Sequence, residues 1–300
     1  GGASYTSSTS VTLSLASTGA AQMRFSNDSG SYGSFVTYAT SHSHTLANTQ
    51  GTRTVSVQFK DAAGNMASAA SDTIVFDTTP PTSNSISIAG GATYTNSTSV
   101  TLTLASTGAS QMRFKNDSGS WSSYESYATS KSWTLMNTQG TRTVWVRFKD
   151  NAGNVASGGS DTIVFDSVAP SAGTVADGSG TDIDVQSSTS TIQANWSGFS
   201  DATSGIDLYQ WAIGTTSGGT QTMGWTNSGV SGTKTGLSLS DGVTYYVSVK
   251  AKDKAGNTSS AAISDGVLAN TSGPTSNAIS INGGASYTSS TSVTLSLAST

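Results

Sequence analysis

Three turns of the chain carry the same run of residues, Lys-Asp-x-x-Gly-Asn, which begins at Lys60, Lys149 and Lys252. Asp can open an Asx-type turn, Gly supplies a positive φ, and Asn tolerates the bend back into a strand. We therefore interpret the signature as a tight turn. The alternative is a calcium site at each module junction. Calcium needs about six to eight oxygen ligands, and one Asp per turn supplies too few unless the linker joins in. The candidate ligands are Asp61, Asp77, Asp150 and Asp166.

A second acidic segment runs from Asp177 through Asp182 to Asp184. It resembles an oxygen-ligand loop, but it lacks the spacing and the closing Glu of an EF-hand. We interpret it as a solvated loop between modules.

His42 and His44 are two residues apart on an expected strand, so both side chains share one face and could hold a metal. The aligned residues of a second repeat copy are Lys131 and Trp133. We therefore expect exposed strand residues here, and no metal site is predicted.

The sequence offers little for catalysis. It has no Gly-x-Ser-x-Gly, no P-loop, no GxGxxG and no paired-His zinc motif. Its many Ser residues have no His base nearby and form only polar surface. We predict no catalytic residue, no cofactor and no enzyme.

Five aromatic residues could stack on sugar rings, which makes glycan binding an alternative. Two of them, Trp133 and Trp145, replace His44 and Ser56 of the first copy, so the positions vary between copies. Contacts between neighbouring modules or fibre subunits explain the rings equally well. The five are Tyr32, Trp121, Trp133, Trp145 and Trp225.

The composition favours strands. Of 300 residues, 58 are Ser and 46 are Thr, only 10% are charged, and 16 of the 17 acids are Asp, which together fit strands and turns and not helices. The net charge of −4 with scattered Lys and Arg predicts no nucleic-acid partner. Apolar runs are strand-sized, which predicts no membrane insertion in this part. The absence of Cys excludes disulfides and thiolate sites.

Internal repeats organise the chain. Residues 1–77 align with residues 90–166 without a gap, and 58 of the 77 positions are identical. Residues 283–300 reproduce residues 1–18, so a cycle of 282 residues begins again near the end. Alternating short strands with turn signals between them are typical of a β-sandwich. The strands expected in the first copy are 9–16, 22–26, 35–39, 44–47, 55–59 and 72–76, and the second copy adds 85–89.

The third module has expected strands at 191–196, 208–213 and 244–252. The run from Leu239 to Tyr245 resembles the fibronectin type III pattern. The resemblance implies that the Tyr245 hydroxyl bonds back to the chain at a sheet corner, and that Trp196 and Trp211 lie in the core. The first two modules carry Arg at the aligned Tyr position and resemble bacterial Ig-like repeats.

With the closing Asp77-Thr78-Thr79-Pro80-Pro81, these features resemble the tandem repeats of giant bacterial surface and fibre proteins. We predict an all-β fold of tandem Ig-like and fibronectin type III-like β-sandwiches in a linear array. The predicted domains are an Ig-like repeat at 1–79 whose first strand is missing, a near-copy at 80–168, a fibronectin type III-like module at 169–272, and the first strands of the next Ig-like repeat at 273–300.

The two ends leave two explanations open. The tail supplies the strand that the first copy lacks, so subunits could exchange strands head to tail. It also duplicates residues 1–18, which favours a window cut from a longer repetitive polypeptide.

The resemblance implies a structural repeat region of a very long extracellular protein that builds a cell-surface or extracellular filament. Its expected partners are copies of itself, and near-uncharged faces rich in hydroxyls favour lateral packing. One alternative is the stalk of a giant bacterial adhesin that binds through a tip outside this window. The other is a set of carbohydrate-binding modules appended to a secreted hydrolase.

Overall fold

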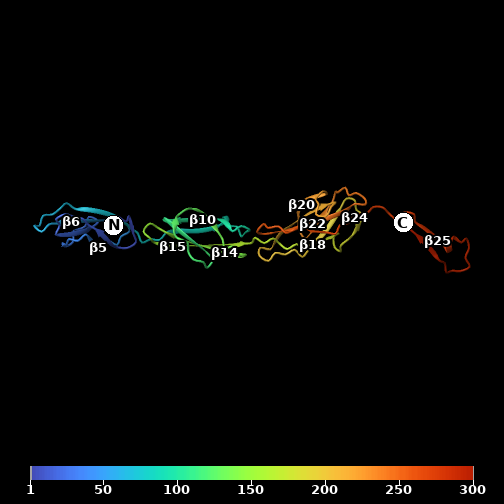
Figure 1. Ribbon diagram of the computed structural model, residues 1–300, viewed down its shortest axis with the longest axis horizontal. Helices are drawn as coiled ribbons and strands as arrows, with labels where there is room; N and C mark the ends of the chain where they lie inside the picture. The colour runs from blue at the N-terminus through green and yellow to red at the C-terminus, as the bar shows by residue number, and fades with distance from the viewer. Residues whose placement is uncertain (1, 300) are drawn as a thin grey trace. The chain divides into compact units, whose positions relative to one another are not determined.

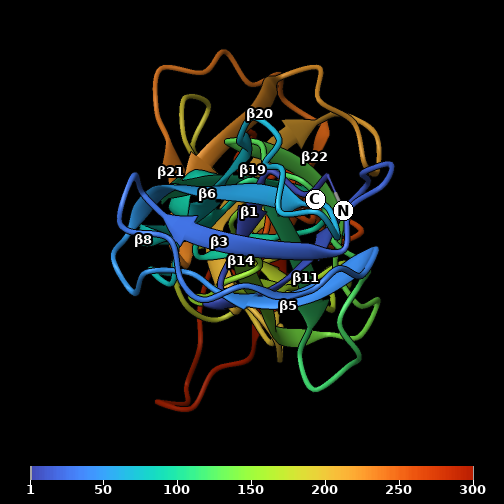
Figure 2. The same cartoon turned by 90° about the vertical axis from the view of Figure 1, so that its left-hand side faces the viewer.

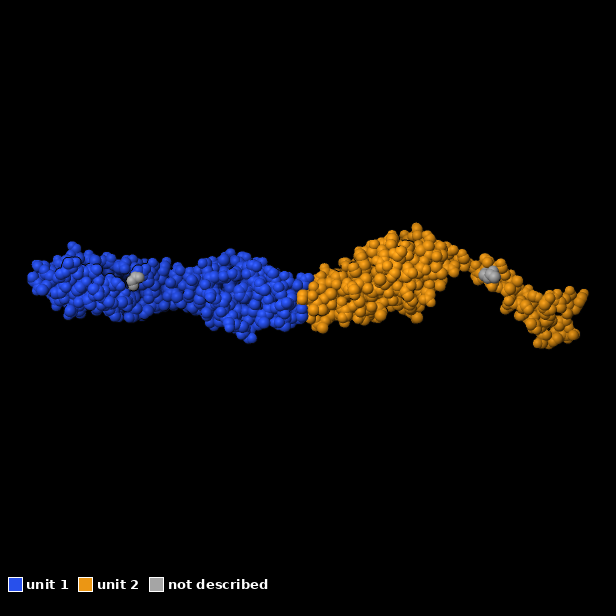
Figure 3. Space-filling view, viewed as in Figure 1, with its two compact units in different colours: residues 1–165 blue, residues 166–300 orange. Residues whose placement is uncertain are grey.

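A computed structural model describes residues 2–299, which form strands joined by turns and contain no α-helix. The chain divides into two compact units, residues 1–165 and 166–300, coloured separately in Figure 3. The predicted domain boundaries at 79/80, 168/169 and 272/273 remain a prediction.

The second repeat copy is a complete sandwich of two sheets, one with the strand order β13-β10-β8 and one with β12-β11-β14-β15-β9 (Figure 1). Apolar side chains alternate along β10 and β14, so one face of each strand is buried between the sheets. The strands are β8 (Thr82–Ile88), β9 (Tyr94–Thr95), β10 (Ser99–Thr107), β11 (Gln111–Asn116), β12 (Glu125–Ser126), β13 (Ser130–Thr134), β14 (Gly140–Lys149) and β15 (Val155–Phe165).

The first copy repeats this arrangement with one strand fewer. Its five-stranded sheet has the order β1-β7-β6-β3-β4, and the opposing sheet contains β2 and β5 among the described residues. In Figure 2 this sandwich faces the viewer, with β3 beside β6 and β5 in the other layer. The strands are β1 (Tyr5–Thr6), β2 (Ser10–Ser14), β3 (Gln22–Asn27), β4 (Val36–Thr37), β5 (Ser41–Thr45), β6 (Gly51–Lys60) and β7 (Ala70–Phe76).

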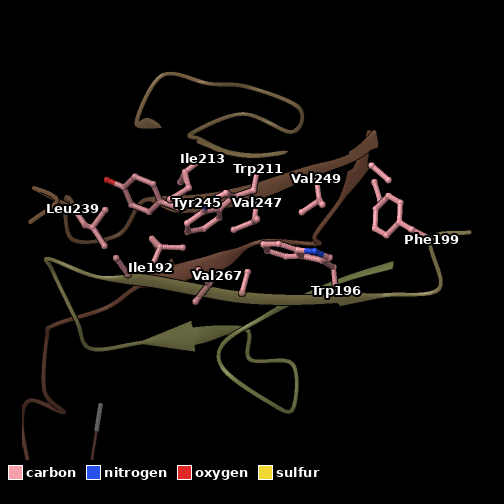
Figure 4. Close-up of a cluster of buried hydrophobic side chains, with 14 residues drawn as sticks. Ile192, Trp196, Phe199, Trp211, Ile213, Leu239, Tyr245, Val247, Val249 and Val267 are labelled. Atoms are coloured by element: carbon pink, nitrogen blue, oxygen red, sulfur yellow. The ribbon is translucent and has the colours of Figure 1, made fainter. Parts of the chain in front are cut away.

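The third module is a sandwich of a β16-β18-β21 sheet and a β17-β24-β22-β19-β20 sheet, with β23 paired to β22. Trp196 and Trp211 lie in its core, where their ring centroids are 6.0 Å apart, and Tyr245 and Leu239 lie together at one end (Figure 4). The strands are β16 (Thr174–Asp177), β17 (Val185–Gln186), β18 (Ile192–Ser197), β19 (Ile206–Gly214), β20 (Met223–Ser228), β21 (Ser231–Lys234), β22 (Thr244–Asp253), β23 (Ala262–Ile263) and β24 (Val267–Ala269).

The remaining strands, β25 (Ala278–Ile281) and β26 (Leu295–Ala298), form an antiparallel pair of their own. Their aliphatic side chains are exposed, and within residues 2–299 no second sheet covers them.

The predicted all-β fold of tandem sandwiches is confirmed. Three of the expected strands are wrong in extent, and one of them, expected at 55–59, is the longer β6. The segment 35–39 contributes only β4, and the strand expected at 44–47 is β5, which pairs with β2 from Ser10 opposite Thr45 to Ser14 opposite Ser41. Leu46 follows that pairing and is buried in the core. No helix within residues 2–299 is long and apolar enough to cross a membrane.

In each of the three sandwiches a tyrosine hydroxyl accepts a hydrogen bond from the backbone N–H of another segment. As the resemblance implied, the Tyr245 hydroxyl accepts a hydrogen bond from the Ser240 N–H, at 2.9 Å. The two Ig-like copies use Tyr38 and Tyr127 instead, whose hydroxyls accept the N–H groups of Ser17 and Ser106 at 3.1 and 3.0 Å.

Replacing Tyr245 by Phe removes the acceptor and leaves the Ser240 N–H unpaired. We expect the free energy of unfolding of the third module to fall by about 1 kcal/mol. Urea unfolding followed by tryptophan fluorescence measures the change. Tyr246→Phe is the matched control, because the Tyr246 hydroxyl forms no hydrogen bond within the described chain. Equal losses in the two variants would show that the corner bond contributes nothing.

Candidate functional site

The signature turn has the same geometry in all three sandwiches. The Asp61 carboxylate accepts the backbone N–H of Asn65 and also its side-chain N–H, both at 2.8 Å. Asp150 binds Asn154 in this way at 2.9 and 2.8 Å, and Asp253 binds Asn257 at 2.8 Å for both bonds. The side-chain amide of Asn65 is the main reason that the pKa of Asp61 lies below its usual value. These bonds agree with the interpretation as a tight turn.

Two of these asparagines also form a side-chain hydrogen bond to an earlier segment of the chain. Asn154 Nδ2 donates to the carbonyl oxygen of Asp77 at 2.8 Å, and Asn257 Nδ2 donates to that of Asp166 at 2.8 Å. Asp77 and Asp166 directly follow β7 and β15. We call this contact the joint bond. Asn65 forms no joint bond with any residue of the part described, and it is exposed, whereas Asn154 and Asn257 are half-buried.

Sequence reasoning missed the joint bond and assigned these residues to a turn or to calcium. The sequence did contain a signal for it. The modules with the second and third signature turns each follow a Phe-Asp pair, Phe76-Asp77 and Phe165-Asp166. What the sequence could not supply was the pairing of residues 77 and 91 positions apart.

Three carboxylates meet around the second joint bond. One oxygen from each of Asp166, Asp201 and Asp253 lies within 4.8 Å of the others, and both Asp166 and Asp253 are buried. Asp166 accepts the N–H groups of Val168 and Ser204 at 3.0 and 3.1 Å. Burial pushes the pKa of Asp201 upward, but the N–H groups of Gly205, Ser204 and Thr203 outweigh it and lower that pKa. Backbone donors thus stabilise part of this negative charge.

The calcium prediction can be compared with the structure at the cluster of Asp166, Asp201 and Asp253. Of the four predicted ligands, only Asp166 lies in a group of three or more acidic or His ligands within the described chain. Carboxylates are the ligands that calcium prefers, and Asp166, Asp201 and Asp253 would hold the ion. Asp201 Oδ1 already accepts the N–H groups of Thr203, Ser204 and Gly205, so Asp201 would bind an ion through its other oxygen. Calcium at the junctions remains a prediction.

The acidic segment that begins at Asp177 is not simply a solvated loop. Asp177 is fully buried, and its carboxylate lies within 4.8 Å of Asp182 and Asp265, whereas Asp184 is outside the group. One oxygen, Oδ2, accepts the Gly266 N–H at 3.1 Å, and the other has no hydrogen-bond partner. Burial is the main cause that raises the pKa of Asp177 to about 6, and the two neighbouring carboxylates add to it.

The outer face of the β11–β14 sheet gathers charges that are scattered in the sequence. Arg113 and Arg147 lie opposite each other across the two strands, and both guanidinium groups lie over the Trp121 ring, at 5.2 and 4.6 Å from its centroid. Lys149 lies over Tyr124 at 4.1 Å. The cations on this face are therefore clustered, and the expectation that they are scattered is wrong here. The absence of a nucleic-acid partner remains a prediction. Its four cations are Arg113, Lys115, Arg147 and Lys149.

The five candidate sugar platforms have different environments. Trp133 is half-buried against Phe114 and donates to Asn116, so it belongs to the core. Cations lie over the other four: Arg24 over Tyr32, Lys115 over Trp145, Lys250 over Trp225, and three cations around Trp121. A sugar would have to displace these cations or use the opposite ring face.

The two histidines are not exposed, which corrects the expectation for them. Both are half-buried on β5, where the His42 ring stacks on Phe25 at 4.5 Å between centroids. His44 Nε2 lies 2.8 Å from Asn27 Oδ1, as Trp133 Nε1 does from Asn116 Oδ1 at 2.7 Å. Burial is the main cause that lowers the pKa of His44, and His42 adds to it. The position of His44 and Trp133 serves packing in both copies, whereas the counterpart of His42, Lys131, forms an ion pair with Glu125.

No protein-family model matches the sequence, and no curated protein matches it significantly. Solved structures of multidomain proteins are similar in outline. A crystal structure of domains from titin has a TM-score of 0.40 at 14% identity, covering 89% of this chain and 94% of that one. The fibronectin(III)-like modules of Clostridium thermocellum CbhA give 0.37 at 12% identity, with 62% and 94% coverage. The FN1–FN3 domains of chicken CNTN1 give 0.35 at 12%, with 88% and 95% coverage. The fold assignment itself depends on the strand order and the cores described above.

Removing the joint bond should loosen the linker that it holds. In Asn154→Ala we expect the backbone amides of Thr78, Thr79 and Thr82, which flank Pro80 and Pro81, to exchange with solvent about tenfold faster, which corresponds to the loss of one hydrogen bond. Segment-resolved hydrogen exchange measures this. Asn65→Ala removes the same bond within a turn but no joint bond, and it should leave those amides unchanged. If these amides exchanged at the wild-type rate in Asn154→Ala, the joint bond would not restrain the linker.

The raised pKa of Asp177 predicts a pH dependence. Below about pH 4 the Asp177 carboxyl is protonated in both the folded and the unfolded state, so its burial does not reduce the stability of the fold. As the pH rises through about 6 the folded state must bury a charge, so stability is lost. Asp177→Asn should therefore stabilise the third module by on the order of 2 to 3 kcal/mol at pH 8 and little at pH 3.5. Urea unfolding in EDTA at both pH values tests this, with the exposed Asp184→Asn as control. A gain that does not depend on pH would contradict the assignment.

Proposed function

We propose that this chain is the structural repeat region of a very long extracellular protein that builds a filament at or near the cell surface. Its role is mechanical: each sandwich carries its own core, and length accumulates by repetition. The partners in the filament are further copies of the same repeats.

The joint bond is the observation that carries this proposal. It recurs between two Ig-like sandwiches, at Asp77 and Asn154, and again at the start of the third module, at Asp166 and Asn257. A contact that does not depend on the kind of module can be repeated through every 282-residue cycle. Pro80, Pro81 and Pro170 lie next to these joints and limit the backbone freedom of the linkers.

Electron microscopy of the native material tests the proposal. Sandwich modules are roughly 35 to 40 Å long, so modules placed end to end give a cycle on the order of 100 to 120 Å. We expect filaments thicker than one module with a regular axial repeat related to this length. Single thin threads that end in a distinct head would contradict the filament and favour the adhesin stalk. A catalytic domain in the same polypeptide would favour the hydrolase appendage.

A further inference from the structure

The third module brings three carboxylates together where its chain crosses from one sheet to the other. Asp177 is the last residue of β16, and the chain then passes Asp182 and joins the opposite sheet at β17. Asp265 lies on the segment between β23 and β24, beside this crossing. The Gly266 N–H donates to Asp177 Oδ2 at 3.1 Å, and the Asp177 N–H donates to Asp182 Oδ1 at 2.6 Å. Two segments that are distant in the sequence therefore meet at one edge of the sandwich.

The three carboxylates are close enough to share one metal ion. One oxygen from each of Asp177, Asp182 and Asp265 lies within 4.8 Å of the other two. Calcium binds oxygen at about 2.3 to 2.6 Å, so two oxygens on one ion are separated by no more than about 5 Å. Asp182 and Asp265 are exposed, so water can supply further oxygen ligands. Magnesium requires a smaller octahedral shell and keeps much of its water, so it fits three protein carboxylates less well.

The buried side chain of Asp177 is the observation that points to a ligand. Its exposed fraction is 0%, and its Oδ1 has no hydrogen-bond partner among the described residues. Buried carboxylates are normally paired or coordinate a metal, because an unpartnered oxygen does not recover the free energy of leaving water. Burial and the carboxylates of Asp182 and Asp265 raise the pKa of Asp177, although Ser264 and Gly266 act in the opposite direction. A cation at this point would satisfy the unpartnered oxygen and offset the repulsion.

The other acidic cluster of the module has a different arrangement. Both oxygens of Asp166 accept backbone N–H groups, and both oxygens of Asp253 accept N–H groups of Asn257. Hydrogen-bond donors therefore already stabilise the buried charge there. Within the described chain, the Oδ1 atom of Asp177 has no such donor. Of the two clusters, the one around Asp177 is the stronger candidate for a metal site.

We propose that Asp177, Asp182 and Asp265 form a calcium site within the third module. Asp177 Oδ1 is the buried ligand, and the exposed carboxylates of Asp182 and Asp265 close the site toward solvent. The ion fastens β16 of one sheet to the segment beside β24 of the other. In a chain without cysteine, it crosslinks the two sheets as a disulfide would. The site lies inside one sandwich, so it depends on neither the filament nor the predicted junction calcium.

Titration of the isotope-labelled chain with calcium chloride, followed by amide NMR, tests the proposal. The Gly266 amide, which donates to Asp177, should shift and saturate with a Kd on the order of 0.1 to 1 mM, as in extracellular calcium modules. The amides of Ser204 and Gly205 report on the Asp166 cluster in the same spectra. Shifts at those two amides alone would place calcium in the other cluster and overturn the proposal. Sodium chloride at equal ionic strength should leave the Gly266 amide in place, and an equal shift would overturn the site as mere screening of charge.

Variants assign the ion to these carboxylates. Asp177→Asn keeps the shape of the side chain and should weaken calcium binding by on the order of a hundredfold. Asp265→Asn, at an exposed position, should weaken it by on the order of tenfold, and it tests the site even if the buried substitution disturbs the fold. Asp184→Asn is the matched control, because Asp184 is exposed and lies outside the group, so wild-type affinity is expected. Wild-type affinity in Asp177→Asn or Asp265→Asn, or an equal loss in Asp184→Asn, would overturn the proposal.

Discussion

The hydrogen bond from a signature asparagine to the carbonyl of an earlier aspartate is the interaction on which the organisation of this chain depends. A primary amide has two hydrogens, and Asn154 uses one to close its own turn on Asp150 and the other to hold Asp77. Asn257 does the same with Asp253 and Asp166. One short motif therefore shapes a loop and restrains the linker before it. This explains why the motif occurs in sandwiches of two kinds.

The second constraint is that small cores must be complete. Each sandwich has its own small core, and in the second copy β8 pairs with β10 and contributes Ile88 to that core. Single hydrogen bonds also fix the loops, because the hydroxyls of Tyr38, Tyr127 and Tyr245 each accept one backbone N–H. In a chain with no disulfide and few ion pairs, sheet completion and individual hydrogen bonds provide the specificity that other proteins obtain from crosslinks.

Local pattern predicted much of this fold, because strand alternation and internal repetition are properties of neighbouring residues. Trp196, Trp211 and the Tyr245 corner followed from a resemblance carried by a short run. The features that were missed depend on register or on distant pairs. The β2–β5 register decides that His42 and His44 lie over Phe25. The β11–β14 register brings Arg113 opposite Arg147. Asp265 joins Asp177 only because the fold brings the segment between β23 and β24 to the end of β16.

The most direct test of the joint bond as the restraint between sandwiches is a distance distribution across the first joint. The chain has no cysteine, so spin labels can be placed uniquely at the exposed, aligned positions Thr52 and Thr141. Double electron–electron resonance should give a single narrow distance in the wild-type background. The distribution should broaden in Asn154→Ala and stay narrow in Asn65→Ala. A broad distribution in the wild-type background, or an unchanged one in Asn154→Ala, would contradict the account.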